Sequence, residues 1–409
     1  MKIFETVIIG AGQAGLSLSY YLSQKDHEHI LLEKTSCTIS NWRTRWDSFT
    51  IVLPNWTLKI PDQYYDGDNP DGFIDKNELI DRFEKFTQSF KPKIHFNTQV
   101  TSLDKNGKND HFILQTNNGE IHAKNVVAAV GTFQIAHIPD IAKGLSPKYT
   151  QLHTDLYRNP KDLPPGGVLV VGAGQSGAQI AEELNDAGRK VYLSTGKTKR
   201  FPRSYRGKDG VWWFNEMGFM DQTVGDLENS RMRFAANPIL SGKNGGHDLD
   251  LHNFAKDGIQ LLGRVVACDG EIVQIGSDLY DNLSFQDEFV AQFKQSIDEY
   301  IEEKGMELIP KQVTPKRNEG FDQPLINELD LEKAGVSTII WGTGYRFDYS
   351  WIHFPILDDD GYPITDRGAT KVQGLYFLGL QWLWKRRSGL LLGIDEDAKY
   401  LASYMEMRF

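Results

Sequence analysis

Two glycine-rich stretches have the residue types and the spacing that bind a dinucleotide. GAGQAG at 10–15 follows the apolar run VII, and GAGQSG at 172–177 follows VLVV. In such a turn the first glycine permits a tight bend, the second lets the backbone approach a pyrophosphate, and the third packs a helix against its strand. The pyrophosphate then accepts hydrogen bonds from free amides at the helix N-terminus. Because an alanine- and leucine-bearing helical pattern follows each stretch, we expect two dinucleotide sites.

The residue that ends the next strand pattern indicates which nucleotide the first turn holds. Glu33 follows the apolar run ILL at 30–32, where a carboxylate accepts the hydroxyls of an adenosine ribose. Because a carboxylate there would repel a 2'-phosphate, we expect FAD at this turn; a solvated strand-end glutamate is the structural alternative. The residues expected to contact FAD here are Gly10, Gly12, Gln13, Ala14, Gly15, Glu33 and Lys34.

The corresponding strand of the second unit, VYLST at 191–195, ends without Asp or Glu and is followed by basic residues. A hydroxyl and several cations at this place suit the 2'-phosphate of NADPH. The alternative is a basic surface loop that binds no ligand. The residues expected to contact NADPH are Gly172, Gly174, Gln175, Ser176, Gly177, Thr195, Lys197, Arg200 and Arg203.

Tryptophan and arginine are concentrated just after the first nucleotide pattern, in NWRTRW at 41–46. Aromatic rings stack on ligands and arginines neutralise pyrophosphate. Trp42, Arg43, Arg45 and Trp46 are therefore expected to contact FAD. A tryptophan-rich edge of the core with exposed arginines would give the same pattern.

The strand and turn signals predict an α/β fold with two Rossmann-like dinucleotide-binding domains, the second inserted in the first. The prolines and glycines at 164–167 mark the entry to the second domain. We expect an FAD domain from 1–163 and 326–409 and an NADPH domain from 164–325. Three further apolar strands end in glycines that should face the cofactors: Gly131, Gly344 and Gly379.

The stretch at about 207–258 loses strict periodicity and is expected to form an insertion on the substrate side of the NADPH domain. It is rich in glycine and large aromatic residues, and long irregular segments are often functional. Trp212, Trp213, Phe214 and His252 could line a substrate cavity. Each of them could equally be buried by ordinary packing.

Composition favours an acidic cytoplasmic enzyme. The formal net charge is −10 and the sequence pI is about 5.5, which argues against nucleic acid as a partner. Cys37 and Cys268, the two cysteines, are far apart in the sequence, so a disulfide scaffold, a zinc site or a dithiol pair is unsupported. Neither a leader segment nor an integral membrane segment is expected. A homodimer stays open.

With these motifs in hand, the sequence resembles the class B flavin-dependent monooxygenases, a group of N-hydroxylating, heteroatom-oxidising and Baeyer-Villiger enzymes. It is similar in particular to their CzcO-type bacterial branch. The matching stretches are GAGQAG, WRTRWDSF, LPN, NPDGF, GAGQSGAQIAEEL, WGTGYRFDYSWI and GLYFLGLQWLWKRRSGLL. The family fingerprint between the domains is matched at His153 and Tyr157, whereas Pro147 and Tyr149 stand in place of its Phe and Gly.

The resemblance implies that NADPH reduces FAD, that oxygen adds to the flavin at C4a, and that one oxygen atom from O2 enters a small organic substrate. It also implies two catalytic positions. Asn55 in LPNW would lie beside the flavin C4a, and Arg386 with Arg387 would form a basic turn near the isoalloxazine or the nicotinamide. A loop-capping asparagine and surface cations are the structural alternatives for these residues.

Two other functions remain open from the sequence. The first is an NADPH-dependent flavoprotein that passes electrons to a quinone or a protein acceptor, since no cysteine pair is present for disulfide reduction. The second is a regulatory flavoprotein that senses nucleotides.

Overall fold

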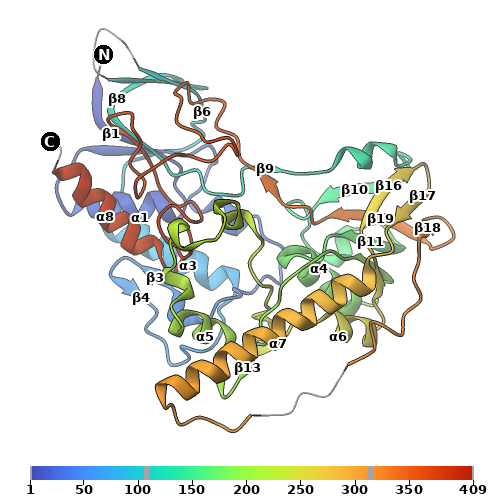
Figure 1. Ribbon diagram of the computed structural model, residues 1–409. Coiled ribbons are helices and arrows are strands. Elements are labelled where there is room, and N and C mark those ends of the chain that lie inside the picture. The colour runs from blue at the N-terminus through green and yellow to red at the C-terminus, as the bar shows by residue number, and fades with distance from the viewer. Residues whose placement is uncertain (1, 106–110, 312–316, 408–409) are drawn as a thin grey trace.

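The computed structural model describes residues 2–105, 111–311 and 317–407. Its first structural unit is built on a seven-stranded sheet, of which β1, β6 and β8 are labelled in Figure 1. The sheet has the order β5-β2-β1-β8-β7-β6, with β21 also paired to β8. Strands β5, β2, β1, β8 and β21 run parallel to one another. Strand β7 pairs antiparallel with both β8 and β6. The strands are β1 (Ile3–Ile9), β2 (His29–Leu32), β5 (Ile94–His95), β6 (Val100–Lys105), β7 (Phe112–Thr116), β8 (Gly119–Ala128) and β21 (Leu375–Phe377).

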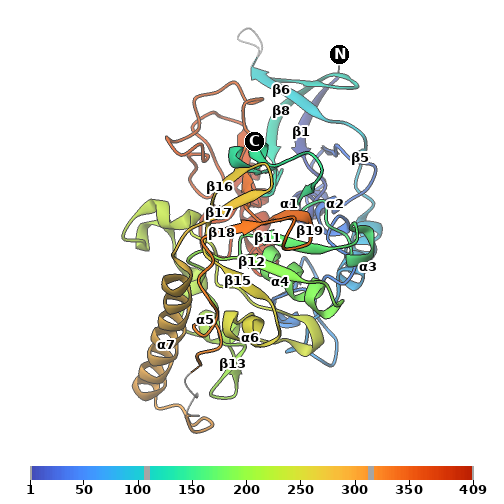
Figure 2. The same ribbon diagram turned by 90° about the vertical axis from the view of Figure 1, so that its right-hand side faces the viewer.

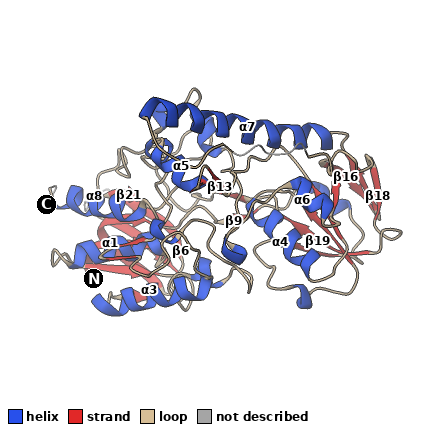
Figure 3. Cartoon of the chain, turned by 90° about the horizontal axis from the view of Figure 1, so that it is seen from below, coloured by secondary structure: helices blue, strands red, loops and turns tan. Residues whose placement is uncertain are grey.

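Three helices accompany this sheet in the lobe that holds both ends of the chain (Figure 3). They are α1 (Gln13–Ser23), α3 (Lys76–Phe90) and α8 (Ile394–Glu406). Leu18 and Leu22 of α1 are fully buried at helical spacing, as an amphipathic helix requires. The Tyr21 hydroxyl of α1 donates to Asp395 of α8, which ties the C-terminal helix to the helix that follows the first glycine turn.

The second unit is built on a five-stranded parallel sheet of order β10-β19-β11-β12-β15. A three-stranded antiparallel sheet, β16-β17-β18, adjoins it, and the long helix α7 runs beside it (Figure 2). The strands are β10 (Thr150–His153), β11 (Gly167–Val171), β12 (Val191–Ser194), β15 (Gln260–Leu262), β16 (Val265–Asp269), β17 (Ile272–Ile275), β18 (Glu328–Asp330) and β19 (Val336–Trp341). The helices are α4 (Gln175–Asp186), α6 (Leu251–Lys256) and α7 (Leu279–Lys304).

The chain leaves the first unit and returns to it through two short strands that pair with each other. These are β9 (Ile135–Ala136) and β20 (Tyr345–Arg346). The second unit is therefore inserted in the first, but the predicted boundaries at 163/164 and 325/326 differ from the sheets. Strands β10 and β19 supply the parallel neighbours on one side of β11, so both belong to the second sheet.

The insertion at 207–258 packs its aromatic residues into a core rather than around an open cavity. Trp213 is fully buried, Phe214 is 9% exposed, and both pack in one cluster with Phe293 of α7. His252 is buried, accepts from the Gly320 amide and donates to Asp287. The packing alternative fits these residues.

The remaining elements are short. None of the described helices is long and apolar enough to cross a membrane. The remaining short elements are α2 (Ser40–Arg43), α5 (Gly210–Glu216), β3 (Lys59–Ile60), β4 (Gln63–Tyr64), β13 (Ser204–Tyr205), β14 (Lys208–Asp209), and the 3-10 turns Asn55–Thr57, Asp140–Gly144, Pro160–Asp162, Phe219–Asp221, Val224–Asp226, Ser230–Phe234 and Lys243–Gly245.

Candidate functional site

The two glycine-rich turns lie at the carboxyl ends of β1 and β11 and have the same backbone geometry. Gly10 and Gly172 have φ of +107° and +104°, and a Cβ on either would lie 2.6 or 2.5 Å from a carbonyl oxygen at the end of a neighbouring strand. A Cβ on Gly15 or Gly177 would lie 2.0 or 1.9 Å from the carbonyl of the first glycine. These four positions thus require glycine for the fold itself.

The middle glycines differ, because they face open space. A Cβ on Gly12 or Gly174 would meet nothing within 4 Å. Each is the N-cap of the following helix, α1 or α4, with extended backbone and no side-chain cap. The first amides of both helices therefore face a space that a side chain would fill. A pyrophosphate fits this arrangement.

Glu33 lies at the end of β2, where its carboxylate reaches the first glycine turn. It is 5% exposed. Its Oε2 accepts from the Ala11 amide at 2.8 Å, and its Oε1 accepts from the Thr35 amide and hydroxyl at 3.0 and 2.8 Å. Because a carboxylate has about four acceptor positions, it can still receive ribose hydroxyls. Lys34 is exposed beside it.

Segments distant in the sequence gather around the first turn. The Gln13 side chain donates to the Gly389 carbonyl at 2.8 Å and accepts from the Trp42 indole at 3.3 Å. A Cβ on Gly379, at the end of β21, would lie 2.4 Å from the Ala14 Cβ. The structure therefore brings together the predicted residues of this site from three parts of the chain.

Two residues that were predicted to contact FAD interact with other residues of the protein. Arg43 forms an ion pair with Glu84 and donates to the Thr38 carbonyl. Trp46 is 3% exposed and packs edge-on against Phe49. The core-edge alternative describes the packing of Trp46, whereas Arg43 is half-buried and ion-paired. Contact of either residue with FAD stays a prediction.

Two of the predicted NADPH contacts near the carboxyl end of β12 have carboxylate partners within the protein. Buried Arg200 pairs with Asp248 and Asp250 at 2.8 and 2.7 Å, and buried Arg203 pairs with Asp209 at 2.6 Å. Carboxylates from the insertion thus neutralise both guanidinium groups, so neither is available to a phosphate in this conformation.

Two other predicted NADPH contacts have different surroundings. The Thr195 hydroxyl is buried and donates to the Leu262 carbonyl at 2.8 Å. Lys197 is exposed, and its ammonium lies 5.8 Å from the Phe285 ring centroid. Lys197 is thus an exposed cation after β12, and its contact with a 2'-phosphate stays a prediction.

Gly131 and Gly344 follow β8 and β19, close to the two chain connections between the units, in which β9 pairs with β20. Gly131 and Gly344 have φ of +71° and +82°, and their sites admit a Cβ without close contact. The Gly344 carbonyl accepts from His153 Nε2 at 3.0 Å, and His153 Nδ1 accepts from the Asp155 amide. Burial lowers the pKa of His153. Its hydrogen bond to Gly344 joins the two chain connections between the units.

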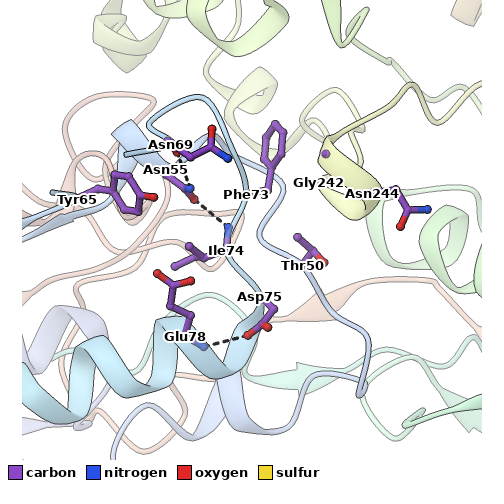
Figure 4. A pocket seen from close by; sticks show the side chains of 11 residues that line it. Thr50, Asn55, Tyr65, Asn69, Phe73, Ile74, Asp75, Glu78, Gly242 and Asn244 are labelled. Carbon is purple, nitrogen blue, oxygen red and sulfur yellow. Dashed lines mark hydrogen bonds between the residues drawn. The ribbon is translucent and has the colours of Figure 1, made fainter. Parts of the chain in front are cut away.

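Asn55 is buried, and both ends of its carboxamide are hydrogen-bonded to the loop at 69–74. Nδ2 donates to the Asn69 carbonyl and Oδ1 accepts from the Ile74 amide, each at 2.9 Å. It also lines a polar pocket of about 330 Å³ (Figure 4), whose far wall is formed by Gly242 and Asn244 of the insertion. The loop-capping alternative thus describes what Asn55 does within the protein.

Arg386 lies in a turn that docks on the insertion. Its guanidinium donates to the Gln222 side chain at 3.0 Å and lies 4.5 Å from the Trp382 ring centroid. Burial lowers the pKa of this group. Arg387 instead forms ion pairs with Asp221 and Glu396. Of these two arginines, Arg386 is the one with no carboxylate partner among the described residues.

A buried carboxyl beside this turn gives a pH prediction. Burial raises the pKa of Asp397 to about 6, and its Oδ2 is buried without a hydrogen-bond partner among the described residues. The pKa of Asp397 is higher in the folded protein than in the unfolded chain. The stability that this carboxyl contributes is therefore fully present below the unfolded pKa and is lost as the pH rises through about 6. Asp397→Asn should therefore gain stability over the wild type, by up to about 3 kcal/mol, at about pH 7 and less at about pH 5. Urea unfolding at both pH values tests this; an equal difference would contradict it.

Each unit thus has a glycine turn that opens onto a helix N-terminus without a side-chain cap, which is the geometry typical of a dinucleotide site. Residues 7–211 match the family model described as pyridine nucleotide-disulphide oxidoreductase. An oxidoreductase of Geobacillus kaustophilus named CzcO-like is 36% identical over 401 residues, which cover 98% of this chain and 97% of the relative. The CzcO oxidoreductase of Bacillus subtilis is 32% identical over 405 residues, covering 98% and 99%.

The chain therefore belongs to the pyridine nucleotide-disulphide oxidoreductase family, within its CzcO-like oxidoreductases. A flavin-containing monooxygenase from Stenotrophomonas maltophilia shares the fold, with a TM-score of 0.68 and 16% identity over 100% of this chain and 99% of that one. The resemblance seen in the sequence motifs is confirmed. The prediction of FAD and NADPH as cofactors agrees with this family and this fold.

Proposed function

We propose that this chain is a monooxygenase that uses FAD and NADPH to insert one oxygen atom from O2 into a small organic substrate. FAD binds the first Rossmann-like unit, and NADPH binds the second unit, which is inserted in the first. The open space at Gly12 and Gly174, above two uncapped helix N-termini, carries the proposal. Fold similarity to a flavin-containing monooxygenase supports oxygen as the acceptor.

The protein's own residues bind and orient the cofactors and exclude water. The amides that begin α1 and α4 hold the two pyrophosphates, and Glu33 holds the ribose of FAD. FAD, when bound, supplies the chemistry of electron transfer from NADPH to O2. Asn55 fixes the loop that faces the flavin, and Arg386 holds a positive charge in the turn at the edge of the site.

Oxygen uptake separates this function from its competitors. The FAD-loaded protein should consume O2 in the presence of NADPH, and a panel of amines, sulfides, ketones and small aromatics should include one that accelerates uptake and is oxygenated. Rapid NADPH oxidation that requires a quinone or a protein acceptor would indicate the electron-transfer function. Slow NADPH oxidation that no compound accelerates would indicate a regulatory flavoprotein.

Asn55→Ala should bind FAD and be reduced by NADPH, yet release more peroxide per NADPH than the wild type. Removing Oδ1 leaves the buried Ile74 amide without its acceptor, at a cost of about 1–3 kcal/mol, so the loop next to the reacting oxygen loosens and admits water. Thr50→Ala, which changes another residue that lines the same pocket, is the control. An unchanged peroxide yield would leave Asn55 with a loop-capping role alone.

A further inference from the structure

One segment of the insertion touches both nucleotide-binding units. In the second unit, Gln175 at the start of α4 donates to the Leu240 carbonyl at 2.6 Å and accepts from the Leu240 amide at 3.1 Å. On its other side, Gly242 of the insertion lies against Ile51 of the first unit. A Cβ on Gly242 would be 2.0 Å from the Ile51 carbonyl oxygen. The segment thus lies between the second glycine turn and the loop that leads to Asn55.

Arg203 fastens this contact. Its Nη1 donates to the Val52 carbonyl of the first unit at 2.9 Å and to the Ser241 carbonyl of the insertion at 3.2 Å. Its Nε donates to Asp209 at 2.7 Å, and the residue is 7% exposed. A planar guanidinium can hold these three partners at fixed angles, which an ammonium group cannot do.

We propose that Arg203 is a positioning residue that sets the distance between the two nucleotide sites. The inference rests on the proposed function, because it assigns to this contact the alignment of NADPH on the second unit with FAD on the first. Reduction of the flavin moves a hydride from the nicotinamide to the isoalloxazine, and a misplacement of about 1 Å can slow such a step about a hundredfold. Arg203 touches neither reacting group in this account.

The test is the rate at which NADPH reduces the bound flavin without oxygen, measured by rapid mixing. Arg203→Ala should keep its flavin and its half-saturating NADPH concentration, while the limiting rate falls about tenfold to a hundredfold. Arg203→Lys keeps the charge opposite Asp209 and should give an intermediate rate. Chemical reduction by dithionite should be equally fast in all forms.

Gly242→Ala keeps the inference testable if Arg203→Ala fails to fold. Its φ of −93° suits alanine, but the new Cβ must push the insertion away from Ile51, so the limiting rate should fall in the same way. Gly225→Ala, in the same insertion with its nearest neighbour at 3.6 Å, is the matched control. Wild-type rates in Arg203→Ala or Gly242→Ala, or equal slowing in Gly225→Ala, would overturn the inference. A wild type that NADPH does not reduce would instead contradict the proposed function.

Discussion

Gly12→Val should give a folded protein that no longer holds FAD. The residue has φ of −80° and ψ of −173°, which valine adopts readily, and its Cβ meets nothing within 4 Å, so the change does not strain the protein alone. The side chain would instead occupy the space of the pyrophosphate and separate it from the first amides of α1. Losing two charge-assisted hydrogen bonds of about 1.5–3 kcal/mol each should weaken FAD binding more than a hundredfold.

Gly174→Val is the matched variant at the second turn. It has the same extended backbone and the same open space, so it should fold, keep its flavin and lose its response to NADPH. Flavin content per protein chain and the melting temperature without cofactor are measured for both variants. Full flavin occupancy in Gly12→Val would show that the first turn is not the FAD site. Loss of folding in its cofactor-free form would show instead that the fold itself requires Gly12.

Arg200→Ala should mainly lower stability, and Lys197→Ala should mainly alter nucleotide preference. Removing the guanidinium leaves Asp250, which is fully buried, with Arg317 as its remaining ion-pair partner among the described residues. Breaking a buried ion pair typically costs about 3–5 kcal/mol, which for a chain of this length corresponds to a melting temperature roughly 3–6 °C lower.

Lys197→Ala removes an exposed cation and should scarcely affect melting. Losing one charge-assisted contact to the 2'-phosphate should raise the KM for NADPH about tenfold and leave that for NADH nearly unchanged. Thermal melting and the two KM values are measured for both variants. A structural role for Arg200 would be contradicted if Arg200→Ala melted normally and selectively lost NADPH affinity.

The sequence was sufficient to predict the parts of the fold that depend on local backbone constraints. A positive φ or a close carbonyl at Gly10 and Gly172 leaves only glycine, so a functional turn must carry the motif. Glu33 was predictable for the same reason, because the strand that follows the first helix ends at a fixed place relative to the turn.

Long-range partners were not predictable from the sequence. Arg200 and Arg203 stand where phosphate-binding cations are expected, yet their carboxylates, Asp248 and Asp209, come from the aperiodic insertion. Likewise, β19 lies beyond the predicted boundary, but it pairs with β11, and such pairing depends on sheet order rather than on local pattern. The hydrogen bond from Arg203 to Val52 is made to a backbone carbonyl oxygen. Every residue has such an oxygen, so no sequence pattern marks this contact.

The most direct test of two separate nucleotide sites is anaerobic addition of NADPH to the purified flavoprotein, followed by its visible absorbance. The flavin of the wild type and of Gly225→Ala should bleach, whereas Gly174→Val should carry flavin that NADPH does not bleach but dithionite does. A wild type that binds no flavin, or a Gly174→Val variant that NADPH reduces as fast as the wild type, would contradict the account.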